Sequence, residues 1–184
     1  MKKFAAVGLV AALFAVPAVA QAQAFVQAEA GLDVVSAEGE SEANIGYGAT
    51  VGYDMPLSGG MFVGVQATYA DSETKRCARD AGEKICLEAG RDVAVLARLG
   101  TSLTEQSKLY VMGGYANARA EVNYYDDGVD GVAGVRSDLD GFRLGAGYQY
   151  DINDKFFVKA EYRYSNYQYD VSRHGAVIAL GAKF

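Results

Sequence analysis

Residues 142–165 read FRLGAGYQYDINDKFFVKAEYRYS, and in this stretch two runs of alternating residues flank a short polar segment. Every second residue of each run is apolar, and the residues between are mostly charged, amide or glycine. Since successive side chains of a strand point to opposite faces of a sheet, each run predicts a strand with one apolar and one polar face. The segment 152–155, with Asn153 and Asp154, predicts the tight turn between them.

The same period of two recurs along most of the chain. It predicts eight strands in all, at residues 26–34, 44–54, 61–69, 92–100, 109–115, 142–150, 156–165 and 176–184. The apolar positions of these segments hold no charged residue, although 22% of the chain is charged. Residues 109–115 are apolar on both faces, so the sequence leaves their orientation open.

The connections between these segments alternate in length. Short turns are expected at residues 55–60, 102–107 and 152–155, and longer polar segments at 36–43, 71–91, 117–138 and 166–174. This alternation is typical of an antiparallel up-and-down β-barrel with two unlike ends.

Two kinds of barrel fit the alternation, because a soluble barrel has its apolar face inside and a membrane barrel has it outside. The aromatic residues of the apolar face lie near both ends of the strands, and smaller aliphatic residues lie between them. Two aromatic girdles around an aliphatic band match a bilayer. The polar face is rich in glycine, which suits a crowded interior better than a solvated surface. We therefore expect an all-β, eight-stranded transmembrane barrel.

Charged residues of the polar face would then lie in a narrow lumen. The predicted lumen charge network contains Glu29, Asp33, Asp92, Arg98, Arg143, Lys159, Glu161 and Arg163. An enclosed charge without a partner is costly, so we expect acids and bases to pair across the lumen.

The N-terminus has the pattern of a secretory signal peptide. Lys2 and Lys3 precede an apolar run over residues 4–20, and small residues follow it. We expect cleavage after Ala22 or Ala24, which gives a signal peptide over residues 1–24 and a barrel domain over residues 25–184. The formal net charge of −6 argues against nucleic acid as a partner.

Cys77 and Cys86 are the only cysteines of the chain. An even count in an exported chain predicts a disulfide between them. Two cysteines with no nearby histidine do not form a zinc site, and we find no nucleotide-binding motif. No metal or cofactor is expected.

One catalytic arrangement is conceivable in this sequence. Asp170, Ser172 and His174 are two residues apart, so on a continuous strand they would share a face, as the Ser and His of some outer-membrane lipid hydrolases do. No feature of the sequence supplies an oxyanion site, however. We treat the lipid hydrolase as a minor alternative and do not expect an enzyme.

Three features together carry a family resemblance: the segment 159–167 (KAEYRYSNY), the final strand ending in ALGAKF at 179–184, and the signal peptide. With them the chain resembles the small outer-membrane β-barrel family of OmpA, OmpX and the opacity-type proteins of Gram-negative bacteria. Phe184 on the apolar phase resembles the signal that the barrel-assembly machinery recognises during insertion.

The resemblance implies an integral protein of the Gram-negative outer membrane, surrounded by membrane lipids and lipopolysaccharide. Its expected role is structural support of the envelope, with adhesion-type binding of a surface ligand through the long loops. A narrow passive porin-like channel is the main alternative, although an eight-stranded barrel has room for little more than side chains. A soluble periplasmic ligand-binding barrel is a further alternative.

Overall fold

The computed structural model describes residues 23–37, 40–72, 75–80, 83–126, 129–168 and 171–184, so nearly all of the predicted signal peptide lies outside it. Almost all described residues belong to nine strands: β1 (Gln23–Ala37), β2 (Glu40–Pro56), β3 (Met61–Ser72), β4 (Lys75–Asp80), β5 (Glu83–Ser102), β6 (Ser107–Asp126), β7 (Val129–Asp151), β8 (Phe156–Tyr167) and β9 (Ser172–Lys183). A short 3-10 turn, η2 (Ser58–Gly60), joins β2 to β3 through two glycines with positive φ. None of the described helical segments is long and apolar enough to cross a membrane.

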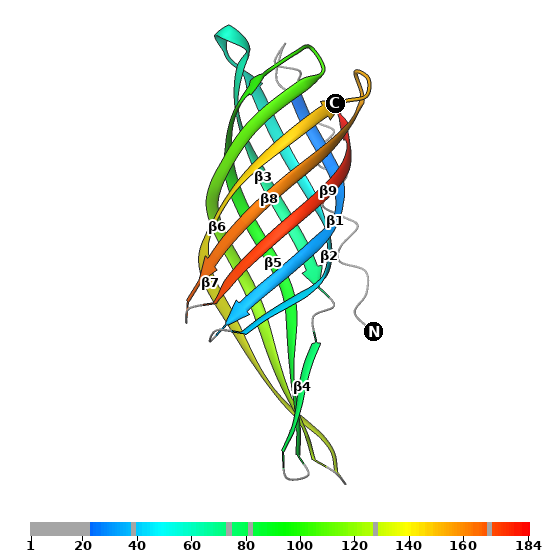
Figure 1. The fold of residues 1–184 in the computed structure, drawn as a ribbon, viewed down its shortest axis with the longest axis vertical. Helices are drawn as coiled ribbons and strands as arrows, with labels where there is room; N and C mark the ends of the chain where they lie inside the picture. The colour runs from blue at the N-terminus through cyan, green and yellow to red at the C-terminus, as the bar shows by residue number, and fades with distance from the viewer. Residues whose placement is uncertain (1–22, 38–39, 73–74, 81–82, 127–128, 169–170) are drawn as a thin grey trace.

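The strands form one antiparallel sheet that closes on itself (Figure 1). Its order is β3-β2-β1-β9-β8-β7-β6-β5-β4, and β3 also pairs with β5. This second pairing closes eight strands into a barrel. Among the described strands, β4 pairs only with β5. The first and last strands meet in register, with Phe25 opposite Lys183. The predicted eight-stranded up-and-down barrel is therefore confirmed.

The apolar stripe of each strand faces outward and the polar stripe faces the lumen. On β7, Leu144 is 53% exposed, whereas the neighbouring Arg143 is 4% exposed. The strand that the sequence left open follows the same frame, because Leu109 and Val111 are exposed while Tyr110 is buried. The outward face carries exposed aliphatic side chains with aromatic side chains toward both ends, as expected for contact with a bilayer.

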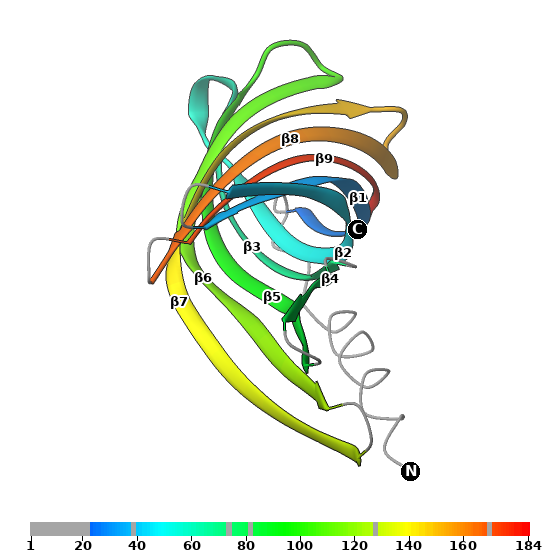
Figure 2. The ribbon, with the colours of Figure 1, turned by 60° about the horizontal axis from the view of Figure 1, so that its bottom comes forward.

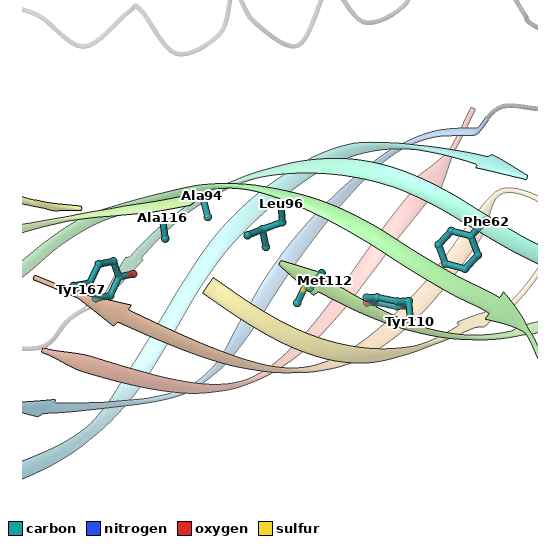
Figure 3. Close-up of a cluster of buried hydrophobic side chains, with 7 residues drawn as sticks. All are labelled: Phe62, Ala94, Leu96, Tyr110, Met112, Ala116 and Tyr167. Atoms are coloured by element: carbon teal, nitrogen blue, oxygen red, sulfur yellow. The ribbon is translucent and has the colours of Figure 1, made fainter. Parts of the chain in front are cut away.

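The interior also holds an apolar cluster, which the sequence pattern did not predict. Figure 3 shows this cluster running along the barrel, with Tyr167 at one end and Phe62 and Tyr110 at the other. Its remaining members are Ala94, Leu96, Met112 and Ala116. Most of it comes from β5 and β6, so this side of the lumen is apolar between the charged Asp92 and Arg98 of β5.

Four aromatic rings fill the lumen near the short turns. Each lies directly opposite a glycine of a neighbouring strand, in the pairs Phe25–Gly52, Phe62–Gly100, Tyr110–Gly147 and Phe157–Gly181. A Cβ atom on any of these glycines would overlap the ring beside it. Glycine is therefore needed at these positions to leave space for the rings.

The segments predicted as long loops at 71–91 and 117–138 are largely strand, which corrects that prediction. β4 and the long ends of β5, β6 and β7 project beyond the other strands at the end opposite the short turns (Figures 1 and 2). Strand pairing needs only backbone hydrogen bonds, and outside a bilayer neither face has to be apolar. The alternation therefore stops at the membrane boundary while the ladder continues. We call β4 and these projecting ends of β5, β6 and β7 the extension.

Candidate functional site

Arg163 lies between two buried carboxylates at the middle of the lumen. Its Nη1 donates to Glu29 Oε1 of β1 at 2.6 Å, and its Nε donates to Glu161 Oε2 on its own strand at 2.8 Å. Tyr110 of β6 donates to the other oxygen of Glu161 at 2.5 Å. These contacts join three strands across the barrel.

Uncharged side chains continue this layer around the wall. Glu29 Oε2 accepts hydrogen bonds from Gln27 Nε2 at 2.9 Å and from Thr50 Oγ1 at 3.0 Å. The hydroxyls of Thr50 and Thr68 lie 2.8 Å apart, which extends the network to β3. The middle layer therefore crosses the lumen and also follows the wall from β1 to β3.

A second layer lies toward the extension and is built around Asp92 of β5. Its Oδ2 accepts hydrogen bonds from Arg143 Nη2, Tyr167 Oη and Arg173 Nη1, each at 2.7 Å. Arg173 also donates through Nε to Asp33 Oδ1 at 2.5 Å. This layer ties β1, β5, β7, β8 and β9 together.

Sequence reasoning missed Arg173 and Tyr167 because both fall in or beside the predicted loop 166–174. A signal was present: extending the alternation of the last strand backward in steps of two from Lys183 places Arg173 on the lumen face. The same step forward from Arg163 reaches Tyr167. The strands are simply longer than their apolar stripes.

A third layer lies among the four rings at the short-turn end. Arg98 Nη1 donates to both oxygens of Asp54 at 3.0 and 3.1 Å, and its guanidinium lies 4.2 Å from the centre of the Tyr110 ring. Lys159 Nζ has no hydrogen-bond partner among the described residues and lies 3.8 Å from the centre of the Phe25 ring. Aromatic faces attract cations, which offsets part of the cost of burying this amine.

The structure thus places all the predicted lumen charges inside the barrel. The ion-paired ones are Glu29, Asp33, Asp92, Arg98, Arg143, Glu161 and Arg163. Lys159 is held by rings instead of a carboxylate. Within the predicted group, Arg163 meets Glu29 and Glu161, and Arg143 meets Asp92. Asp33 and Arg98 pair instead with residues outside that group, Arg173 and Asp54. The charges divide into three layers that the sequence did not indicate.

Two small cavities lie in the described part of the lumen. A cavity of about 40 Å³ lies between the middle layer and the Asp92 layer, and one of about 120 Å³ lies at the short-turn mouth beside Asp54 and Lys108. Such volumes hold a few water molecules at most. Within the described residues, no group of three or more His, Cys, Asp or Glu side chains is arranged to hold a metal ion.

Ser172 and His174 both lie on β9. In a catalytic triad the Nδ1 atom of the histidine contacts an acid, but here it contacts a tyrosine. His174 Nδ1 lies 2.7 Å from Tyr162 Oη, and its ring lies 5.0 Å from that of Tyr164. The histidine is therefore engaged with two tyrosines of β8. Asp170, the third member of the conceivable triad, lies outside the described residues.

At the base of the extension, charged residues replace apolar ones on the outward face. Arg119 Nε donates to Asp138 Oδ1 at 2.9 Å, and Asp140 accepts hydrogen bonds from Tyr115 and Asn117. The hydrogen bond from Arg119 lowers the pKa of Asp138, and that from Tyr115 lowers the pKa of Asp140. Both carboxylates therefore carry their negative charge at neutral pH.

The backbone register of the extension places Cys77 of β4 directly opposite Cys86 of β5. Directly opposed residues of antiparallel strands have Cα atoms about 4.5–5.5 Å apart, which is within the range that a disulfide spans. The disulfide stays a prediction with a favourable register.

Sequence comparisons agree with the barrel. A family model described as "Outer membrane protein beta-barrel domain" matches residues 6–184. A 31 kDa outer-membrane immunogenic protein of Brucella melitensis is 28% identical over 125 residues, which cover 65% of this chain and 52% of that protein. The same values hold for the protein of that name from Brucella suis. The chain thus spans about half the length of these curated relatives.

Solved structures show the same fold. Ail, the attachment invasion locus protein of Yersinia pestis, solved with the heparin analogue sucrose octasulfate, has a TM-score of 0.65 at 16% identity and covers 89% of this chain and 99% of its own. Neisserial surface protein A has a TM-score of 0.62 at 17% identity, with 88% and 97% covered. At these identities the likeness concerns the fold alone.

Proposed function

Since this chain belongs to the outer-membrane protein β-barrel family and is a protein of the Gram-negative outer membrane, we propose that its barrel is a closed support for adhesion-type binding by the extension. The observation that carries this proposal is the contrast between the two ends: short turns at one end, and at the other a four-stranded sheet that projects beyond the barrel (Figure 1). A barrel filled with ion pairs and rings is rigid, and rigid scaffolds commonly present binding segments.

The partners we propose follow from the two surfaces. The outward aliphatic band contacts membrane lipids, and lipopolysaccharide headgroups lie at the level of the outer aromatic girdle. Phe184, which is 63% exposed at the end of the last strand, is the signal we propose for the barrel-assembly machinery. The extension would bind a ligand at the cell surface.

We propose the cleavage of the signal peptide after Ala22 rather than after Ala24. β1 begins at Gln23, and Phe184 N donates to Ala24 O at 2.9 Å, so cleavage after Ala24 would remove a backbone contact that closes the barrel. Mass spectrometry of the mature protein, with Gln23 or Phe25 as its first residue, distinguishes the two sites.

Neither alternative activity gains support from the site. A channel would need a continuous water path, whereas three layers of paired side chains cross this lumen. A hydrolase of the Ser-His-acid type would need an acid at His174 Nδ1 to orient the ring, whereas this nitrogen lies 2.7 Å from Tyr162 Oη. We therefore propose a non-enzymatic role.

The experiment that tests adhesion compares cells that display the full chain with cells that display a shortened form. In the shortened form, a tight turn replaces residues 119–138 and residues 75–88, which removes most of the extension and keeps the barrel strands. Adhesion of bacteria to cultured epithelial cells should fall at least tenfold. A folded barrel in both forms is verified by gel mobility with and without boiling, and unchanged adhesion with a folded shortened barrel contradicts the proposal.

A further inference from the structure

Two buried cations near the short turns have donor atoms without acceptors. Lys159 of β8 is 2% exposed, and its Nζ has no hydrogen-bond partner among the described residues. Arg98 of β5 is 1% exposed, and its Nε and Nη2 also have no partner there. A buried charge is costly unless hydrogen bonds satisfy it. These three donor atoms therefore need an acceptor that the described side chains do not supply.

Both cations lie against the same two aromatic rings. The guanidinium carbon of Arg98 lies 4.9 Å from the centre of the Phe25 ring and 4.2 Å from the centre of the Tyr110 ring. Lys159 Nζ lies 3.8 Å and 5.8 Å from the same two centres. We call these four side chains the ring site. The rings offset part of the cost of burial, but they do not cancel the repulsion between two positive charges, which an anion in contact with both would compensate.

The carboxylates at this end of the lumen are engaged by other groups. Both oxygens of Asp54 accept hydrogen bonds from Arg98 Nη1. Asp151 accepts hydrogen bonds from Gln149 Nε2 at 2.7 Å and from Lys183 Nζ at 2.8 Å. None of these carboxylate oxygens accepts a hydrogen bond from the buried amine of β8.

The charges of the described lumen do not cancel. The Asp92 layer has two acids and two bases. The middle layer has Glu29 and Glu161 around Arg163, and each of their oxygens accepts a hydrogen bond. The short-turn end has two acids and four bases: Asp54, Asp151, Arg98, Lys108, Lys159 and Lys183. Across the described lumen one positive charge is therefore uncompensated, and it lies at the short-turn end.

The cavity at the short-turn mouth leads toward the ring site. This cavity of about 120 Å³ is lined by Asp54, Phe62 and Lys108, among others. The Phe62 ring lies 5.5 Å from the guanidinium of Arg98, and Figure 3 shows it at the same end of the apolar cluster as Tyr110. A cavity of this size holds a few water molecules at most, and a halide ion is similar in size to water. The mouth therefore suits a halide and excludes a large organic anion.

We propose that a small inorganic anion, with chloride as the probe, binds in the ring site and accepts hydrogen bonds from Lys159 Nζ and from Nε and Nη2 of Arg98. Charge-assisted hydrogen bonds of this kind are stronger than neutral ones. One ion per barrel balances the excess positive charge. Since the short turns of outer-membrane barrels lie on the periplasmic side, the ion would enter from the periplasm. Its binding stabilises the filled lumen and does not depend on the adhesion proposed for the extension.

The test uses the full mature chain, refolded in a nonionic detergent without halide. Sodium gluconate is replaced stepwise by sodium chloride at constant ionic strength, so that charge screening stays the same. Circular dichroism follows the rate of unfolding in urea at each step. Because a ligand that binds only the folded barrel stabilises it, we expect chloride to slow unfolding at least threefold and the effect to saturate.

Lys159→Met removes the charge and keeps a side chain of similar length. The matched control is Lys155→Met, since Lys155 is exposed in the short turn before β8. We expect the chloride dependence to disappear in Lys159→Met and to stay unchanged in Lys155→Met. Gel mobility with and without boiling verifies that both variants are folded.

Crystals of the parent protein grown in sodium bromide locate the ion and need no variant. We expect an anomalous peak in hydrogen-bond contact with Lys159 Nζ and Arg98. Bromide peaks at the protein surface alone mean an adventitious ion only and would overturn the inference. Unfolding rates that do not change with chloride, or a chloride effect that persists in folded Lys159→Met, would also overturn it. None of these results bears on the adhesion of cells with a shortened extension, so the two proposals fail separately.

Discussion

Arg163 has two carboxylates within reach and is itself 6% exposed, so its removal leaves buried charge without compensation. We expect Arg163→Met to lower the free energy of unfolding by about 3–5 kcal/mol, as breaking a buried ion pair does. Urea unfolding of barrels refolded in lipid vesicles measures this change.

The matched control for Arg163→Met is the triple variant with Glu29→Gln and Glu161→Gln. It removes all three charges, and we expect it to recover most of the lost stability because no ion remains buried alone. A single variant as stable as the parent would contradict the role of Arg163 as the link between the two acids.

A substitution at Gly147 tests whether the aromatic rings in the lumen need the space that glycine leaves. A Cβ at this position would overlap the ring of Tyr110, whereas a Cβ at Gly175 would have its nearest neighbours at 3.9 Å. We expect Gly147→Ala to destabilise the barrel by about 1–3 kcal/mol, the usual cost of overpacking. Gly175→Ala should change stability by less than about 0.5 kcal/mol. Similar effects of the two substitutions in urea unfolding would argue against ring–glycine packing.

At the scale of a strand, alternation decides which residues meet lipid. Leu144 is exposed on β7 beside buried Arg143, so Leu144→Arg places a charge in the aliphatic band. We expect a loss of about 2–4 kcal/mol in vesicles, as for arginine at the midplane of outer-membrane barrels. Leu103, exposed in a short turn, is the control, since Leu103→Arg should cost at most about 1 kcal/mol.

The β4–β5 hairpin carries the predicted disulfide. If Cys77 and Cys86 are bonded, closing a loop of this length stabilises the hairpin by roughly 2.5–3 kcal/mol in the chain-entropy model. We expect reduction, or Cys77→Ser with Cys86→Ser, to speed proteolysis between residues 73 and 90 while the remainder of the barrel stays resistant. Peptide mapping by mass spectrometry locates the cuts, and equal rates in oxidised and reduced protein would exclude the bond.

The sequence predicts a strand wherever every second residue is apolar. The period of two located all eight barrel strands and the faces of all but the strand at 109–115, because a bilayer requires outward positions to be apolar. It failed in the extension, where water satisfies both faces. It also missed the ends of β8 and β9, where Tyr167 and Arg173 fell into an expected loop. The ends of β5, β6 and β7 depend on backbone pairing between segments, which no single segment encodes.

At the scale of the whole molecule, the lumen layers depend on barrel closure. Glu29 and Arg163 are 134 residues apart in sequence, and the sequence could name them as members of one network without indicating that they meet. Their pairing follows from the register of β1, β9 and β8, which is a property of the closed sheet. Lys159 also required the fold, because its ring partners Phe25 and Phe157 were not recognised as lumen residues.

A closed lumen predicts electrical silence. In planar lipid bilayers, the purified protein should produce no steady unitary current steps, because the described cavities of about 40 and 120 Å³ are separated by ion pairs and rings. The control is an outer-membrane porin reconstituted under the same conditions. Reproducible steps from the parent protein would favour the narrow channel over the filled support.

The four ring–glycine pairs have a consequence for how the barrel is assembled. Each pair lies in a different couple of neighbouring strands: β1–β2, β3–β5, β6–β7 and β8–β9. A slip of one residue moves a whole strand's side chains to the opposite face, so it would turn the ring toward lipid and present the glycine with the wrong neighbour. The pairs therefore favour the native register of these four couples of strands over a register that is shifted by one residue.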